Sequence, residues 1–163
     1  MKFFGGLLDR IVLLFGVLLG GCAPSFINQY RQRVGGRLDQ VLQDLAPFQA
    51  IADRYHGGSL EALIQHHLRS PDRTFYEEGA AIQAMVDAAE RLRAAQAALE
   101  TDIWHQLAYV VMHHDPEIVR ATLTSYEPAF MITPDSLLVA AVVGFGAWLL
   151  FMAVWRLLAF LSR

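Results

Sequence analysis

The chain has 163 residues, of which 55% are hydrophobic and 18% are charged. Its mean hydropathy of +0.33 is more apolar than that of an ordinary soluble domain. This composition excludes a disordered chain, because disordered chains are polar and strongly charged. The net charge of −3 argues against nucleic-acid binding, and the single cysteine, Cys22, excludes an intrachain disulfide scaffold.

The N-terminal segment, residues 1–30, is predicted to be a transmembrane helix, because residues 11–30 carry no charge. Two alternatives stay open. One is a cleaved secretory signal. The other is a lipoprotein signal at Leu19-Gly20-Gly21-Cys22, in which Cys22 would be lipidated and everything before it removed. Asp9 weighs against cleavage, since a leader normally begins with basic residues.

The middle segment, residues 31–133, is predicted to be an extramembrane helical domain. Apolar residues recur at heptad spacing over residues 34–55 and again over residues 82–99, which predicts an antiparallel hairpin with coiled-coil-like packing. Shorter helices are expected over residues 59–69 and 102–114 and after Asp115, and Thr74 is expected to form a capping box with Glu77. No strand pattern appears, so the predicted fold class is all-α.

The C-terminal segment, residues 134–163, is predicted to be a second transmembrane helix. Residues 136–155 carry no charge, and 20 residues of helix are about 30 Å long, the thickness of a bilayer's hydrocarbon core. Thr133 can cap the helix N-terminus with Pro134 at its first position. Gly144 and Gly146 would allow a close approach to a neighbouring helix.

The charge distribution predicts the membrane topology. Residues 31–135 contain 9 Arg against 15 Asp and Glu, whereas the two terminal segments have a net charge of +3. Basic ends favour both termini in the cytoplasm and the middle domain in the periplasm. Counting along both helices places Asp9, Arg10 and Arg156 at the same depth. There an Asp9–Arg156 or Asp9–Arg10 ion pair would reduce the cost of the charges, or each charged side chain would extend into the headgroups by itself.

No catalytic, cofactor-binding or metal-binding residues are predicted. None of the six histidines forms the i, i+4 pair of a helical zinc site, and carboxylates at helix starts are explained by the helix dipole. Cys22 lies in an apolar stretch, where a nucleophilic thiol would not be activated. The histidines are His56, His66, His67, His105, His113 and His114, and the carboxylates are Glu77, Glu78, Asp115 and Glu117.

Three runs of sequence resemble a family. They are Pro-Ser-Phe-Ile-Asn-Gln-Tyr at residues 24–30, Pro-Phe-Gln-Ala-Ile-Ala-Asp-Arg at residues 47–54 and Gly-Ser-Leu-Glu-Ala-Leu-Ile at residues 58–64. They resemble a proteobacterial membrane family of unknown function, domain of unknown function 2937, over nearly the whole chain. The resemblance implies a bacterial inner-membrane protein with a hydrophilic helical middle, and it implies no activity. Cys22 does not look like part of that family's pattern.

The expected function is therefore that of a non-catalytic inner-membrane scaffold or accessory protein, without a cofactor. Its helical domain would bind another envelope protein or a second copy of itself, while the terminal helices sit in the lipid bilayer. One alternative is a small oligomeric channel or transporter component, although the centres of the two spans contain no ionisable residue. The second alternative is a lipoprotein anchored at Cys22.

Overall fold

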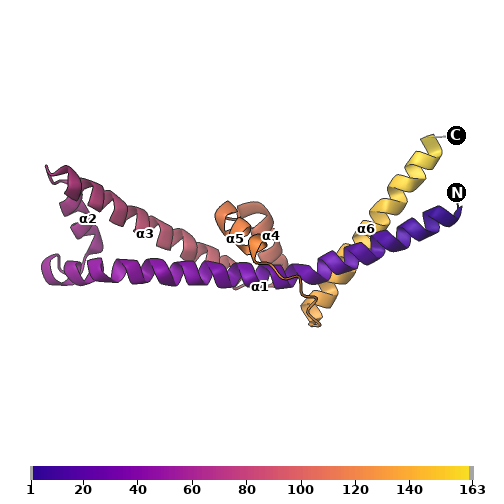
Figure 1. Ribbon diagram of the computed structural model, residues 1–163, viewed down its shortest axis with the longest axis horizontal. Coiled ribbons are helices and arrows are strands. Elements are labelled where there is room, and N and C mark those ends of the chain that lie inside the picture. The colour runs from indigo at the N-terminus through magenta and orange to yellow at the C-terminus, as the bar shows by residue number, and fades with distance from the viewer. Residues whose placement is uncertain (1, 162–163) are drawn as a thin grey trace. The chain divides into compact units, whose positions relative to one another are not determined.

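The computed structural model describes the backbone of residues 2–161 and the side chains of residues 6–158. Within that range the chain forms six helices and no strand (Figure 1), so the predicted all-α class is confirmed. The helices are α1 (Lys2–Tyr55), α2 (Leu60–Leu68), α3 (Arg73–Leu99), α4 (Ile103–His113), α5 (Pro116–Thr124) and α6 (Pro134–Leu161).

The chain divides into two compact units. Unit 1 consists of residues 1–30 and 110–163, and unit 2 consists of residues 31–109. Helix α1 contributes its first part to unit 1 and its remainder to unit 2. A single helix of 54 residues carries both the predicted N-terminal span and the first predicted heptad stretch, and residues 31–33, Arg-Gln-Arg, which join the two, all favour a helix.

Helix α1 ends at two glycines. Gly57 and Gly58 have positive φ angles of 59° and 83°, a conformation that glycine adopts without steric cost. The Gly58 N–H donates to the carbonyl oxygen of Ala52 at 3.1 Å, which satisfies one of the free carbonyl groups at the helix end. The chain thereby turns out of α1 into α2, whose N-cap is Ser59.

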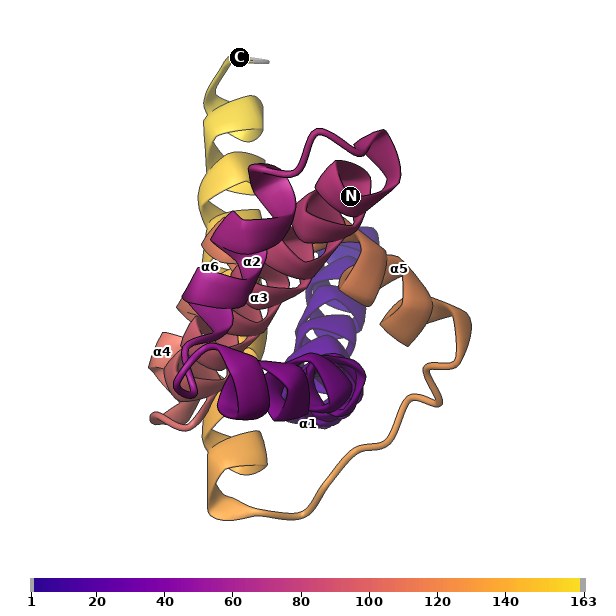
Figure 2. The ribbon, with the colours of Figure 1, turned by 90° about the vertical axis from the view of Figure 1, so that its left-hand side faces the viewer.

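The core of unit 2 is built from α1, α2 and α3. It contains five buried side chains, to which both predicted heptad stretches contribute: Leu38, Leu45, Ile64, Ile82 and Ala89. Helices α2 and α3 lie side by side (Figure 2). At their contact a Cβ on Gly79 would come within 2.8 Å of the Cβ of His67, so this approach needs a glycine. The coiled-coil geometry of the α1 and α3 stretches stays a prediction.

The expected capping box at the start of α3 was wrong. The N-cap is Asp72, whose carboxylate accepts the Thr74 N–H at 2.8 Å. Glu77 instead forms an ion pair with Arg73 at 2.9 Å. An aspartate caps a helix as well as a threonine does, and here Asp72 precedes Thr74 and begins the helix two residues earlier.

Unit 1 packs the first part of α1 against α6 and α5. Helix α6 begins as predicted, since Thr133 accepts the Ser136 N–H at 3.2 Å and Pro134 is its first residue. The Tyr30 hydroxyl accepts the Asp115 N–H at 3.0 Å. Asp115 in turn caps α5, so this hydrogen bond joins the start of α5 to the end of the uncharged part of α1.

Candidate functional site

Three of the six histidines gather at one end of unit 2. The His56 ring, just after α1, lies 5.4 Å from the His66 ring on α2, and His67 follows on a different face of α2. His105, His113 and His114 do not join them. No group of three or more His, Cys, Asp or Glu side chains among the described residues could hold a metal ion. Spacing along the chain gave no signal for this cluster, because His56 lies in the turn after α1 whereas His66 lies on α2.

His67 is held in a fixed orientation. It is 9% exposed, and its Nδ1 lies 3.1 Å from the carbonyl oxygen of Leu63, to which it can donate. Its ring stacks on Phe75 at 5.5 Å, and its Nε2 lies 3.8 Å from the Glu78 carboxylate. Contacts from both α2 and α3 therefore set the position of one imidazole at the edge of the cluster.

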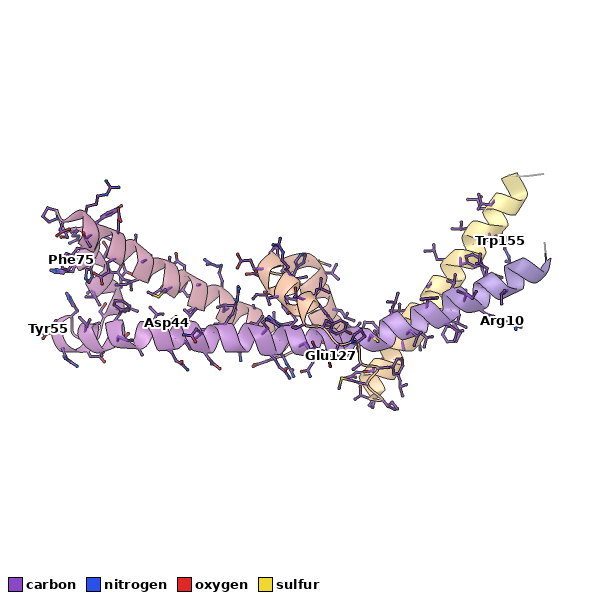
Figure 3. All side chains as sticks on the ribbon, in the orientation of Figure 1. Arg10, Asp44, Tyr55, Phe75, Glu127 and Trp155 are labelled. Atoms are coloured by element: carbon purple, nitrogen blue, oxygen red, sulfur yellow. The ribbon has the colours of Figure 1, made fainter. Side chains whose placement is uncertain are left out.

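Two hollows meet at the histidine cluster. The polar hollow, about 620 Å³, is lined by His56, Ala62, Gln65, His66, Arg69, Ser70 and Pro71. The aromatic hollow, about 460 Å³, is lined by Phe48, Ile51, Tyr55, His56, Leu63, His66, His67, Phe75 and Glu78. Both volumes fall in the range of small-ligand sites. His56 and His66 are common to both hollows, and Figure 3 shows Tyr55 and Phe75 at this same end.

Helices α1 and α6 cross at very close range in unit 1. A Cβ on Gly16 would come within 2.9 Å of the Gly144 Cα, and a Cβ on Gly20 would come within 3.0 Å of the Ala140 Cα. Glycines four residues apart form the small-residue pattern that lets two membrane helices approach closely. The predicted close approach therefore holds for Gly144 but not for Gly146, around which nothing lies within 4 Å.

Both helices are long and apolar enough to cross a membrane. The most apolar windows of Gly6–Tyr55 and Pro134–Leu158 have mean hydropathies of 2.0 and 2.5. Only 28% and 17% of these windows are buried, whereas the core helix of a soluble protein is mostly buried. Length, apolarity and exposure together make α1 and α6 candidate membrane spans.

The Gly20-Gly21-Cys22 segment is covered by its own chain. Gly20 packs on Val139 and Ala140, and the ring of Phe130 lies where a Cβ of Gly21 would be. The Tyr126 hydroxyl donates to the Cys22 carbonyl at 2.9 Å. Burial raises the pKa of Tyr126 above its usual value. The segment that resembles a lipoprotein signal is thus a packed part of unit 1.

The contact register of α1 and α6 does not bring Asp9 opposite Arg156. The contacts Gly16–Gly144 and Gly20–Ala140 define an antiparallel register, which puts Asp9 level with Phe151. Arg156 lies five residues further along, or about 7.5 Å of helix. No ion pair joins Asp9 to Arg10 or Arg156 among the described residues, and Asp9 Oδ1 is buried without a hydrogen-bond partner. The expected ion pair is therefore absent among the described residues, whereas the equal depth of these charges in a membrane stays a prediction.

The other carboxylates have local roles. Asp115 accepts the Glu117 and Ile118 N–H groups at the start of α5, at 2.8 and 3.2 Å. A hydrogen bond from His105 lowers the pKa of Asp102 below its usual value, helped by main-chain N–H donors. These are helix caps, and they do not converge on a shared reaction site.

A family model described as "Protein of unknown function (DUF2937)" matches residues 4–163. No curated protein and no solved structure matches the chain.

Proposed function

The chain belongs to the DUF2937 family of proteins of unknown function. From its two candidate membrane spans and its exposed apolar surface, we propose that it is a non-catalytic scaffold or accessory protein of the bacterial inner membrane. Helices α1 and α6 anchor it as a multi-pass protein, with both termini in the cytoplasm. The helical domain between them lies in the periplasm and binds another envelope protein.

One observation carries the binding role. Large apolar side chains stay exposed around the aromatic hollow of unit 2, with Tyr55 75%, Phe75 48% and Ile51 40% exposed. Aromatic side chains grouped around a concavity are typical of protein-binding surfaces. None of the three belongs to the core cluster of unit 2, which is built from other residues, and this supports a partner-binding role for them.

Site-specific cross-linking in intact membranes tests this proposal. A photoreactive amino acid at Tyr55 or Phe75 is expected to give one discrete protein adduct, because both side chains border the proposed surface. The same amino acid at Gln43, an exposed position of α1 outside the hollow's lining, is the matched control. Adducts of equal identity and yield at all three positions, or no adduct at Tyr55 and Phe75, would contradict a binding role for this end.

The topology is tested separately. Fusions of a reporter active only in the periplasm to residue 100 and to residue 163 should be active only in the first case, because the terminal segments are basic and the middle is acidic. The opposite pattern would reverse the orientation while leaving both anchors in place.

The channel or transporter alternative is favoured by Asp9. Asp9 lies at the end of the uncharged stretch of α1, and a buried carboxyl oxygen without a hydrogen-bond partner at the end of a span is a group that an ion or proton pathway could use. Flux of protons or cations in proteoliposomes that Asp9→Asn abolishes would establish this alternative, whereas absence of flux in an oligomer-containing preparation would remove it.

The lipoprotein alternative requires cleavage before Cys22. Cleavage would remove Gly16 and Gly20, which form the close crossing with α6. Intact mass measurement of the membrane-extracted protein decides the matter. A mass that includes residues 1–21 supports the two-helix anchor, and a mass that begins at a lipid-modified Cys22 overturns it.

A further inference from the structure

The polar hollow has the lining of an anion site. Its polar side chains are the imidazoles of His56 and His66, the guanidinium of Arg69, the amide of Gln65 and the hydroxyl of Ser70, and no carboxylate is among its lining residues. An arginine provides a permanent charge and several N–H donors, and each imidazole adds a further donor. The Gln65 amide already donates to Glu61 at 2.9 Å, so Arg69 and the two imidazoles supply the free donors.

The aromatic hollow adjoins it across the same two imidazoles. Its walls are mainly apolar, with Phe48, Ile51, Leu63 and Phe75, and Glu78 stands at its edge beside His67. A volume of about 460 Å³ has room for one large side chain. The His56 and His66 rings, 5.4 Å apart, line both hollows, so the two hollows share a wall.

We propose that the two hollows form one site for a peptide segment that ends in a carboxylate and carries an aromatic or large aliphatic side chain beside it. The carboxylate binds Arg69, His56 and His66 in the polar hollow, and the side chain enters the aromatic hollow against Phe75. Capture of a terminal carboxylate by convergent donors is a recurring mode of peptide recognition. This inference rests on the proposed function, because it specifies the part of the partner that binds.

Glu78 favours a peptide over a lipid as the occupant. The Glu78 side chain is 48% exposed. An acyl chain in the aromatic hollow would displace water from this carboxylate and offer it no donor, which is unfavourable. A peptide has main-chain N–H groups beside its apolar side chain, and these can donate to Glu78.

The test uses the full chain in an uncharged detergent with 13C-labelled histidine. The probe is a pool of acetylated tetrapeptides ending in phenylalanine with a free carboxylate, compared with the same pool as C-terminal amides. The free-acid pool is expected to shift the His56 and His66 signals, assigned by His56→Gln and His66→Gln, and to leave the His105 signal in place. The amide pool should bind at least tenfold more weakly.

Two variants separate the contribution of the polar hollow from that of the aromatic hollow. Arg69→Gln should weaken the free acid about tenfold and the amide little, whereas Phe75→Ala should weaken both. Arg73→Gln is the matched control, because Arg73 is 91% exposed, forms an ion pair with Glu77 and lines neither hollow. Circular dichroism of each variant checks that the helices remain.

Three results would overturn the peptide site: equal binding of acid and amide, no effect of Arg69→Gln, or shifts produced by dodecyl phosphate and not by the peptide acids. The last result would assign the hollows to a lipid. If the peptides fail while cross-linking at Tyr55 still yields a discrete adduct, the scaffold role stands without this site. If the peptides bind and no adduct forms, the site stands and the scaffold role falls.

Discussion

Replacing Gly144 with alanine is expected to destabilise the α1–α6 pair. The added Cβ would lie 2.5 Å from the Val17 Cγ2 and 3.1 Å from the Val17 main-chain nitrogen. Because the second of these atoms is backbone, a rotamer change cannot relieve the contact, and the helices must separate. Overpacking of this kind costs about 1–3 kcal/mol.

Gly146→Ala is the matched control on the same helix. Nothing lies within 4 Å of a Cβ at Gly146, and alanine is a better helix former than glycine by about 1 kcal/mol. The two substitutions therefore have opposite expected signs although they add the same methyl group two residues apart. The propensity gain is common to both variants, so their free energies of unfolding should differ by the packing cost alone, about 1–3 kcal/mol.

The assay is unfolding of the full chain in mixed micelles with increasing dodecyl sulfate, followed by tryptophan fluorescence. Trp148 and Trp155, both on α6, report on its environment. Equal midpoints for Gly144→Ala and Gly146→Ala would refute the close crossing. The double variant Gly16→Ala with Gly144→Ala should cost less than the sum of the single variants, because the first separation makes room for the second methyl group.

Three further predictions concern packing and titration. Gly79→Ala should destabilise unit 2 by about 1–3 kcal/mol in denaturant unfolding, since its Cβ would meet the Leu68 main-chain nitrogen at 3.1 Å, whereas Gly36→Ala, with open space around it, should not. Tyr126→Phe should cost about 0.5–1.5 kcal/mol through its lost hydrogen bond. Because the pKa of Tyr126 is raised, the native state holds the Tyr126 proton to a higher pH than the unfolded state does. The free energy of unfolding should therefore fall as the pH rises above 10.0, and it should fall less in the phenylalanine variant. Asp102 should titrate below 3.8 by NMR, and His105→Ala should bring its pKa back toward that value; an unchanged titration would contradict the hydrogen bond.

Helix ends set by local chemistry could be predicted from the sequence. Thr133 with Pro134 marked the start of α6, Asp115 marked the start of α5, and the glycines after Tyr55 marked the end of α1. Each signal lies within a few residues of the helix end that it determines. The same kind of signal gave a wrong prediction for the start of α3. Asp72 and Thr74 could both cap this helix, and Asp72, the earlier of the two, is its N-cap.

Contacts between distant residues could not be predicted in the same way. Gly16 and Gly20 lie four residues apart in the sequence. Only the contact register of α1 against α6 shows that Gly144 lies against this pair of glycines and that Gly146 does not. The histidine cluster depends on the path of the chain through Gly57 and Gly58, which sets where α2 points after α1 ends. The periodicity of a sequence predicts which residues share one face of a helix. The turn before the helix determines which other residues that face contacts.

The division of the chain has a consequence for the order of folding. Unit 1 is discontinuous, and about 130 residues separate Gly16 from Gly144, so bringing them together carries a large loop-closure entropy. Unit 2 lies within that loop and has its core within residues 38–92. If unit 2 folds first, the flexible loop shrinks to about 50 residues, which lowers the closure cost by on the order of 1 kcal/mol. Prior folding of unit 2 would then speed the assembly of α1 with α6, and variants that slow the folding of unit 2 should delay that assembly.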